Sequence, residues 1–117
     1  MDNAPVQDPT LYITYKNYSS WSLRVWLLMC AFDIPFEELL FPMTDDCRMP
    51  GMDSISPTGK VPCLVDHTHD LTIWDSVAIT EYMAERHPEC AIWPEDMVDR
   101  ATARALVAEM HAGFLSL

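Results

Sequence analysis

Apolar runs alternate with short polar segments along the chain, and their spacing predicts a succession of strands and helices. Residues 11–15 (LYITY) are β-branched and aromatic, which favours a strand. The polar segment NYSS follows, and it supplies turn and capping residues for a helix over residues 22–33. One face of this helix is marked by four residues at the spacing i, i+3, i+4, i+7: Leu23, Trp26, Leu27 and Cys30. Apolar residues also occupy its other faces, so we expect the helix to be covered on more than one side.

The next segments predict a second strand and an irregular connection. Pro35 ends the helix, and residues 34–41 (IPFEELLF) continue as a strand. The resulting strand–helix–strand unit has a length typical of a parallel crossover. Residues 44–56 contain proline, glycine and scattered acids, which indicates irregular chain with a short helix.

A hairpin and a helix are predicted to complete this unit. Residues 61–66 and 71–74 are short apolar strands joined by the polar turn HTHD, which is typical of an antiparallel hairpin. Residues 75–87 begin with the capping residues Asp75 and Ser76 and stop before a proline. The helix predicted there carries three apolar residues on one side: Ile79, Tyr82 and Met83. The element order β-α-β-α-β-β-α is the thioredoxin-like pattern, an α/β fold with a four-stranded mixed sheet.

The predicted elements divide the chain into four parts. Residues 1–10 are expected to be a flexible N-terminus, 11–87 the thioredoxin-like domain and 88–98 a linker that lies against a surface through Ile92 and Trp93. From about Asp99 an alanine-rich segment predicts a further helix, 99–117. Its apolar stripe consists of Ala103, Val107, Met110 and Phe114.

Composition narrows the function classes. With 117 residues and 50% hydrophobic content the chain is large enough for one domain with a core. A formal net charge of -11 disfavours nucleic acid and anionic membranes as partners, because both attract clustered Lys and Arg. The N-terminal residues lack the pattern of a secretory signal, and no apolar run is long enough to span a bilayer. We therefore expect a cytoplasmic protein.

The four cysteines are expected to be reduced thiols. They lie far apart in the sequence, at positions 30, 47, 63 and 90, and form no C-x-x-C pair. Cys63, His67 and His69 are the only group with a metal-like composition, and solvated turn histidines are the simpler interpretation. No metal site is predicted.

Four motifs in order resemble the soluble glutathione transferases. They are YSSWSLRV (18–25), SPTGKVPCL (56–64), WDSVAITEYMAE (74–85) and ARALVAEMHAGF (103–114). The sequence is most similar to bacterial serine-type members related to the zeta class. The resemblance implies the thioredoxin-like N-terminal domain of that family, followed by the first helix of an all-helical second domain, with the chain a truncated form.

The resemblance places the thiol-activating hydroxyl at the start of the first helix. Ser19 aligns with the serine that donates a hydrogen bond to the sulfur of glutathione, Ser20 is the close alternative, and Tyr15 is a weaker one. A hydroxyl at a helix N-terminus favours a thiolate. Capping of the helix is the usual role of such serines and remains an alternative. Trp21 stands where zeta members usually carry cysteine, which disfavours both zeta-like isomerase chemistry and glutaredoxin-like reduction.

The other motifs imply the glutathione-binding residues. Pro62 is expected in the cis form, so that the backbone of Val61 pairs with the cysteinyl unit of glutathione as an added strand would. Lys60 lies where relatives place a polar residue near the ligand, although a solvated turn lysine is equally reasonable. Asp75 is implied to bind the γ-glutamyl amine and Ser76 its α-carboxylate, whereas simple capping of the helix is the alternative.

The function implied by this resemblance is glutathione transferase. Glutathione would act as co-substrate, without a further cofactor, and its thiolate would attack a small electrophile in a detoxification reaction. The full-length form is expected to be a homodimer, and the 117-residue chain by itself is expected to be inactive. A non-catalytic glutathione-transferase-like module for dimerisation or complex assembly is the alternative, since nothing in the sequence identifies the electrophile.

Overall fold

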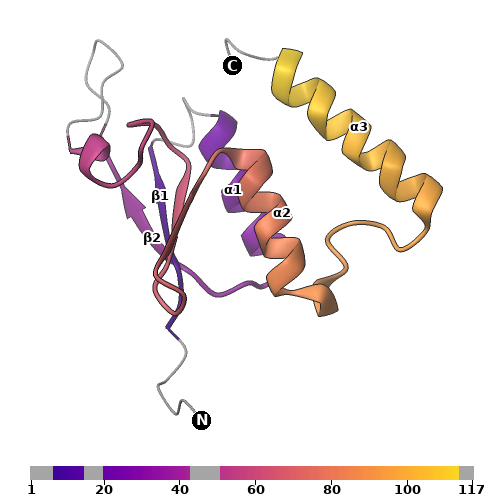
Figure 1. Cartoon of the computed structure of the whole chain (residues 1–117), viewed down its shortest axis with the longest axis horizontal. Coiled ribbons are helices and arrows are strands. Elements are labelled where there is room, and N and C mark those ends of the chain that lie inside the picture. The colour runs from indigo at the N-terminus through magenta and orange to yellow at the C-terminus, as the bar shows by residue number, and fades with distance from the viewer. Residues whose placement is uncertain (1–6, 15–19, 43–50, 114–117) are drawn as a thin grey trace.

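Strand β1 lies in the interior of a four-stranded mixed sheet with the order β2-β1-β3-β4. The computed structural model describes residues 7–14, 20–42 and 51–113. The elements in chain order are β1 (Thr10–Ile13), α1 (Ser20–Ala31), β2 (Glu37–Leu40), the 3₁₀ turn η1 (Met52–Ser54), β3 (Cys63–Asp66), β4 (Leu71–Trp74), α2 (Ser76–Arg86), the 3₁₀ turn η2 (Pro88–Cys90) and α3 (Met97–Gly113) (Figure 1). This is the predicted thioredoxin-like order, followed by one further helix.

The pairing of the strands confirms both sequence-based predictions about the sheet. β1 and β2 are parallel, as expected for a strand–helix–strand crossover. β1 and β3 are antiparallel, and β3 and β4 form the predicted antiparallel hairpin. Because β1 lies between a parallel and an antiparallel neighbour, the sheet is mixed.

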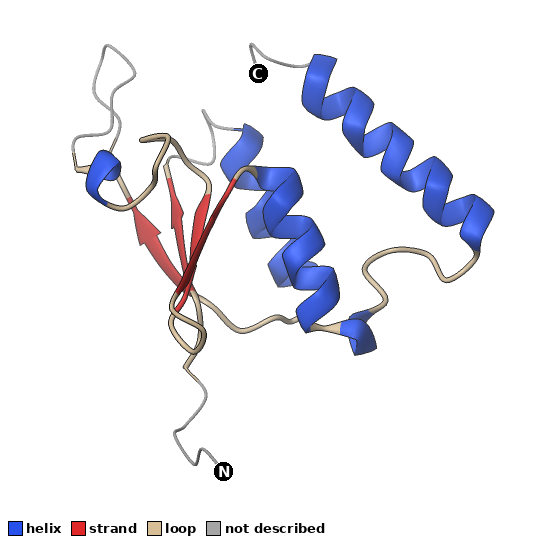
Figure 2. Ribbon diagram, in the orientation of Figure 1, coloured by secondary structure: helices blue, strands red, loops and turns tan. Residues whose placement is uncertain are grey.

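Helices α1 and α2 pack against each other on one side of the sheet, whereas η1 lies on the other side (Figures 1 and 2). The core between the sheet and the two helices consists of Leu11, Ile13, Val25, Met29, Ile34, Leu64, Ile79 and Met83. The predicted apolar side of α2 is confirmed, since Ile79 and Met83 are buried and Tyr82 packs against the core.

Covering of α1 on more than one side, as the sequence predicts, is not seen in the described residues. Val25 and Met29 are buried in the core and Trp26 packs against it, while Leu27 is 51% exposed and Cys30 is also exposed. An α-helix that is apolar on every face carries several stripes with the same period, so periodicity cannot identify the buried one. The choice depends on how the β1–α1 connection and the sheet orient the helix.

Several element boundaries differ from the prediction by a few residues. α1 begins two residues before the predicted Ser22, and α3 begins at Met97 rather than Asp99. The second strand is confined to Glu37–Leu40, and η2 forms at the start of the predicted linker. Ile92 packs against the core, as expected for a linker lying on a surface.

Among the described residues, none of the helices combines the length and the hydrophobicity that a membrane-spanning segment requires.

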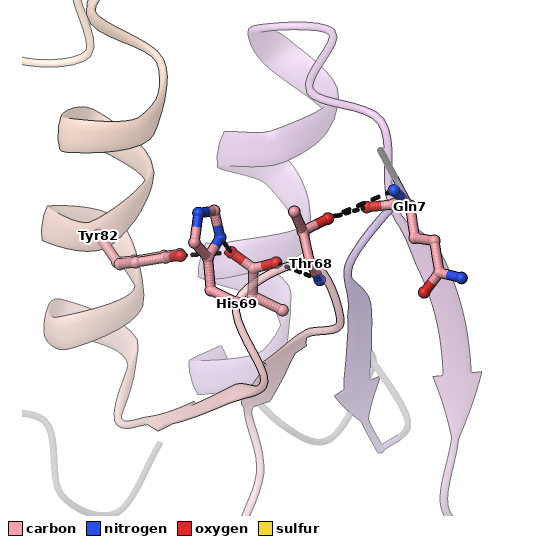
Figure 3. A network of polar contacts seen from close by, with 5 residues as sticks. Gln7, Thr68, His69 and Tyr82 are labelled. Carbon is pink, nitrogen blue, oxygen red and sulfur yellow. Dashed lines mark hydrogen bonds and ion pairs between the residues drawn. The ribbon is translucent and has the colours of Figure 1, made fainter. Parts of the chain in front are cut away.

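The turn between β3 and β4 is tied to α2 by a buried carboxylate. Asp66 is 6% exposed, and its carboxylate accepts hydrogen bonds from the Tyr82 hydroxyl, from His69 Nδ1 at 2.9 Å and from the backbone N–H of Thr68 at 3.0 Å (Figure 3). His67 in the same turn contacts the Thr10 hydroxyl through Nε2 at 2.7 Å. The two histidines of the turn therefore hold structural contacts and are not merely solvated.

These contacts set the ionisation of the carboxyl and phenol groups. Burial raises the pKa of Asp66, but the hydrogen bonds from Tyr82 and His69 outweigh it, so the net pKa lies below its ordinary value. Burial and the bond to Asp66 raise the pKa of Tyr82 to about 12. Both shifts favour the charged carboxylate and the neutral phenol over most of the pH range.

Replacing Tyr82 by phenylalanine is expected to lower the free energy of unfolding by about 1–2 kcal/mol at neutral pH, because a buried carboxylate loses a donor. The pKa of Asp66 is lower in the folded protein than in the unfolded chain, so its stabilisation is present above the unfolded value of about 3.9 and is lost as the pH falls through the folded value. Urea unfolding at pH 7 and pH 3 should therefore show a smaller difference in the free energy of unfolding between variant and wild type at the lower pH. A difference independent of pH would contradict this account.

Candidate functional site

Three chain segments meet at one edge of the sheet because of the strand register. Tyr12, near the end of β1, pairs with Cys63 at the start of β3, and Cys63 pairs with Trp74 at the end of β4. The turn before β3 and the turn after β4 therefore lie at the edge where β1 ends. Helices α1 and α2 both begin at this edge (Figure 1). Two helix N-termini provide backbone N–H groups and partial positive charge for an anionic ligand.

Asp75 and Ser76 form the start of α2. Asp75 caps the helix, since its Oδ1 accepts a hydrogen bond from the backbone N–H of Val77 at 2.9 Å. Its backbone has φ 80°, a left-handed conformation that is unfavourable for a non-glycine residue and is common at functional sites. Ser76 is buried as the first residue of the helix. The capping interpretation is thus confirmed for Asp75, whose carboxylate remains 43% exposed and can be reached by a ligand.

The turn before β3 brings Lys60, Val61 and Pro62 to the same edge. The peptide bond between Val61 and Pro62 is cis, as the resemblance implied. Pro62 is buried, Val61 is half-buried and Lys60 is exposed. The backbone N–H of Lys60 contacts the Thr58 hydroxyl at 3.3 Å. The position and exposure of Lys60 suit either a ligand contact or a solvated side chain.

The predicted thiol-activating residues lie partly beyond the described ranges. Ser19 and the weaker alternative Tyr15 fall outside them. Ser20 is the first residue of α1, whose N-terminus lies at this edge. The choice between Ser19 and Ser20 stays a prediction.

His111 also belongs to this edge, and the sequence analysis did not single it out. It lies in the last turn of α3, and its Nε2 is 2.9 Å from Oδ1 and 3.0 Å from Oδ2 of Asp75. The two residues are 36 positions apart in the chain. No local pattern relates them, so only the packing of α3 beside α2 could reveal the pair.

A cavity of about 330 Å³ separates α3 from the two other helices. Its lining is mostly apolar, and Ser76 and His111 contribute polar groups to it. Val107 and Met110, from the predicted stripe of α3, also line it. Phe114, the last residue of that stripe, lies outside the described residues.

The described cysteines do not supply the chemistry of the site. Cys30, Cys63 and Cys90 are free thiols, and burial raises the pKa of Cys63, which disfavours a thiolate there. Cys47 lies outside the described residues. Within the described ranges, no three His, Cys, Asp or Glu side chains gather in a way that could hold a metal ion.

Comparison with known proteins supports the family resemblance that the sequence motifs indicate. Residues 18–86, more than half of the chain, match the family model described as "Glutathione S-transferase, N-terminal domain". The chain is 33% identical over 101 residues to maleylacetoacetate isomerase of Pseudomonas aeruginosa, covering 84% of this chain and 46% of that protein. It is 35% identical over 86 residues to dichloromethane dehalogenase of Methylorubrum extorquens, covering 72% of this chain and 29% of that protein.

A solved structure has the same fold as this chain. A glutathione transferase homologue from Burkholderia, crystallised with bound glutathione, superimposes with a TM-score of 0.78 at 26% identity, covering 93% of this chain and 57% of that one. The chain spans about half the length or less of the curated relatives that it matches.

Proposed function

The chain belongs to the glutathione S-transferase family, and from that premise we propose that it binds glutathione and activates the thiol for attack on an electrophilic small molecule. The observation that carries this proposal is the meeting of three segments at one edge of the sheet. These are the start of α1, the turn containing cis-Pro62, and the Asp75–Ser76 start of α2. Together they offer a helix N-terminus, the half-buried Val61 beside Pro62, and a carboxylate beside a hydroxyl.

Each part of glutathione finds a complementary group in this arrangement. The γ-glutamyl ammonium would pair with the exposed carboxylate of Asp75, and its α-carboxylate with the hydroxyl and N–H of Ser76 at the N-terminus of α2. The backbone of Val61 would pair with the cysteinyl unit, as an added strand does. Lys60 would approach the same ligand from the turn. The thiol would then lie toward the start of α1, close to Ser19 and Ser20.

The proposed reaction uses the sulfur of glutathione as nucleophile. A hydroxyl hydrogen bond and the partial positive charge of the α1 N-terminus favour loss of the thiol proton to solvent. The thiolate electron pair then forms a sulfur–carbon bond with the electrophile, and the displaced group leaves with its own bonding electrons. Glutathione serves as co-substrate, and the reaction needs no other cofactor.

We extend the proposal to the setting of the complete protein, as a cytoplasmic homodimer that conjugates harmful electrophiles. Large apolar side chains exposed on this chain support an association surface, among them Leu27 at 51% and Trp74 at 43% exposure. The net charge of -11 is consistent with a small-molecule substrate rather than a polyanionic partner.

The substitution Ser76→Ala tests the binding part of the proposal. We expect glutathione to bind about tenfold more weakly, because the ligand carboxylate loses a hydrogen bond to a buried hydroxyl. Isothermal titration calorimetry with glutathione measures the effect. Ser54→Ala is the matched control, since Ser54 is an exposed serine in η1 that bonds only the Gly51 carbonyl among the described residues. Absence of glutathione binding by the wild-type protein would refute the proposed function.

A further inference from the structure

The contact between His111 and Asp75 links α3 to the candidate glutathione site. An ionised carboxylate only accepts hydrogen bonds, so Nε2 of His111 carries the proton and donates. Its distances to the two carboxylate oxygens differ by only 0.1 Å, at 2.9 and 3.0 Å. The ring N–H therefore points between the two oxygens, and it restrains rotation of the carboxylate.

A second donor holds the same carboxylate from another element. The backbone N–H of Val77 in α2 donates to Oδ1 at 2.9 Å. A carboxylate can accept about four hydrogen bonds. With Val77 on Oδ1 and His111 on both oxygens, acceptor capacity remains on Oδ2, and the side chain is 43% exposed. The carboxylate is thus oriented by the protein and still accessible to a cationic ligand group.

A second, separate contact joins α3 to α2. The guanidinium of Arg104 is 3.4 Å from the carboxylate of Glu81 and stacks over Trp93, with 5.3 Å from its central carbon to the ring centroid. These residues are not part of the candidate glutathione site. They join α3 to α2 and to the segment before it without contacting Asp75, and because both charged side chains are about half exposed, the pair is expected to contribute little to the position of the helix.

We propose that His111 is a positioning residue for glutathione, orienting the Asp75 carboxylate toward the γ-glutamyl ammonium. This inference rests on the proposed function, because it assumes that Asp75 binds the amine of glutathione. It makes the selectivity for that amine depend on α3, a helix outside the thioredoxin-like unit. His111 acts through Asp75 and need not touch the ligand.

The test compares glutathione with its analogue glutaryl-cysteinyl-glycine, which lacks only the γ-glutamyl amino group. For His111→Ala we expect glutathione to bind about fivefold more weakly, while the affinity for the analogue changes less than twofold. His111→Gln keeps an N–H donor on a side chain of similar reach and should restore most of the difference. Calorimetric titration of both ligands on each variant provides the measurement.

Arg104→Ala is the matched control, because it removes an α3 contact outside the site. If Arg104→Ala reproduces the amine-selective loss of affinity seen with His111→Ala, a general displacement of α3 is responsible and the specific role of His111 is wrong. Equal affinities of wild type and His111→Ala for glutathione also overturn the inference. Tighter binding of glutathione by the variant overturns it too, because His111 would then compete with the ligand ammonium for the Asp75 carboxylate. If wild-type protein binds neither ligand, the proposed function itself has failed.

Discussion

Replacing Ser19 by alanine is expected to raise the pKa of the thiol of bound glutathione by about one to two pH units. A hydrogen bond to a charged group contributes about 1.5–3 kcal/mol, and one pH unit corresponds to about 1.4 kcal/mol. At neutral pH the smaller thiolate fraction should lower the conjugation rate by about 10- to 100-fold. The affinity for glutathione should change little, because under the proposed function the tripeptide is held mainly by Val61, Asp75 and Ser76.

Two measurements separate activation from binding. Thiolate absorbance titrated with pH reports the pKa of the bound thiol, and calorimetry reports the affinity of the protein for glutathione. Ser20→Ala and Ser22→Ala are the matched comparisons, since both serines belong to the first turn of α1. A larger effect of Ser20→Ala would move the assignment by one residue. If none of the three variants changes the pKa of the thiol, the serines only cap the helix and a non-catalytic binding module becomes the better interpretation.

The largest loss of stability is expected for Met29→Ala in α1. Met29 is fully buried between the helix and the sheet, and truncating such a side chain costs about 2–5 kcal/mol through lost burial and the cavity left behind. Leu27→Ala in the same helix is the matched control. Because Leu27 is 51% exposed, its truncation should change the free energy of unfolding by less than about 1 kcal/mol.

Urea unfolding of the two variants measures both values under the same conditions. The comparison also tests the orientation of α1, since the structure places Met29 in the core and leaves Leu27 exposed. Equal losses would mean that Leu27 is also covered in the protein as it occurs in solution.

Most of the element order follows from local sequence rules. The hairpin of residues 71–74 with its partner strand was predicted from two apolar runs around a polar turn, and the structure has β4 at Leu71–Trp74. The start of α2 was predicted from Asp75 and Ser76, and Asp75 is indeed the N-cap. Such features depend on neighbouring residues, so one sequence contains enough information to predict them.

The boundaries and the buried face of α1 were less predictable. Strand ends depend on where a partner strand stops pairing, which explains why β2 is shorter than its apolar run. The face of α1 was ambiguous because Leu27 and Met29 are equally apolar, and only the sheet beneath the helix distinguishes them.

By itself, the sequence determined the fold class, the order of elements and the motifs that carry Val61, Pro62, Asp75 and Ser76, because each of these is written in a short stretch of chain. Only the tertiary structure decided that Asp66 is held by Tyr82 and that Asp75 is held by His111. These partners lie 16 and 36 residues apart, on elements that meet only after the sheet and helices have packed. Contacts of that kind depend on three-dimensional geometry, which the spacing of residues along one chain does not encode.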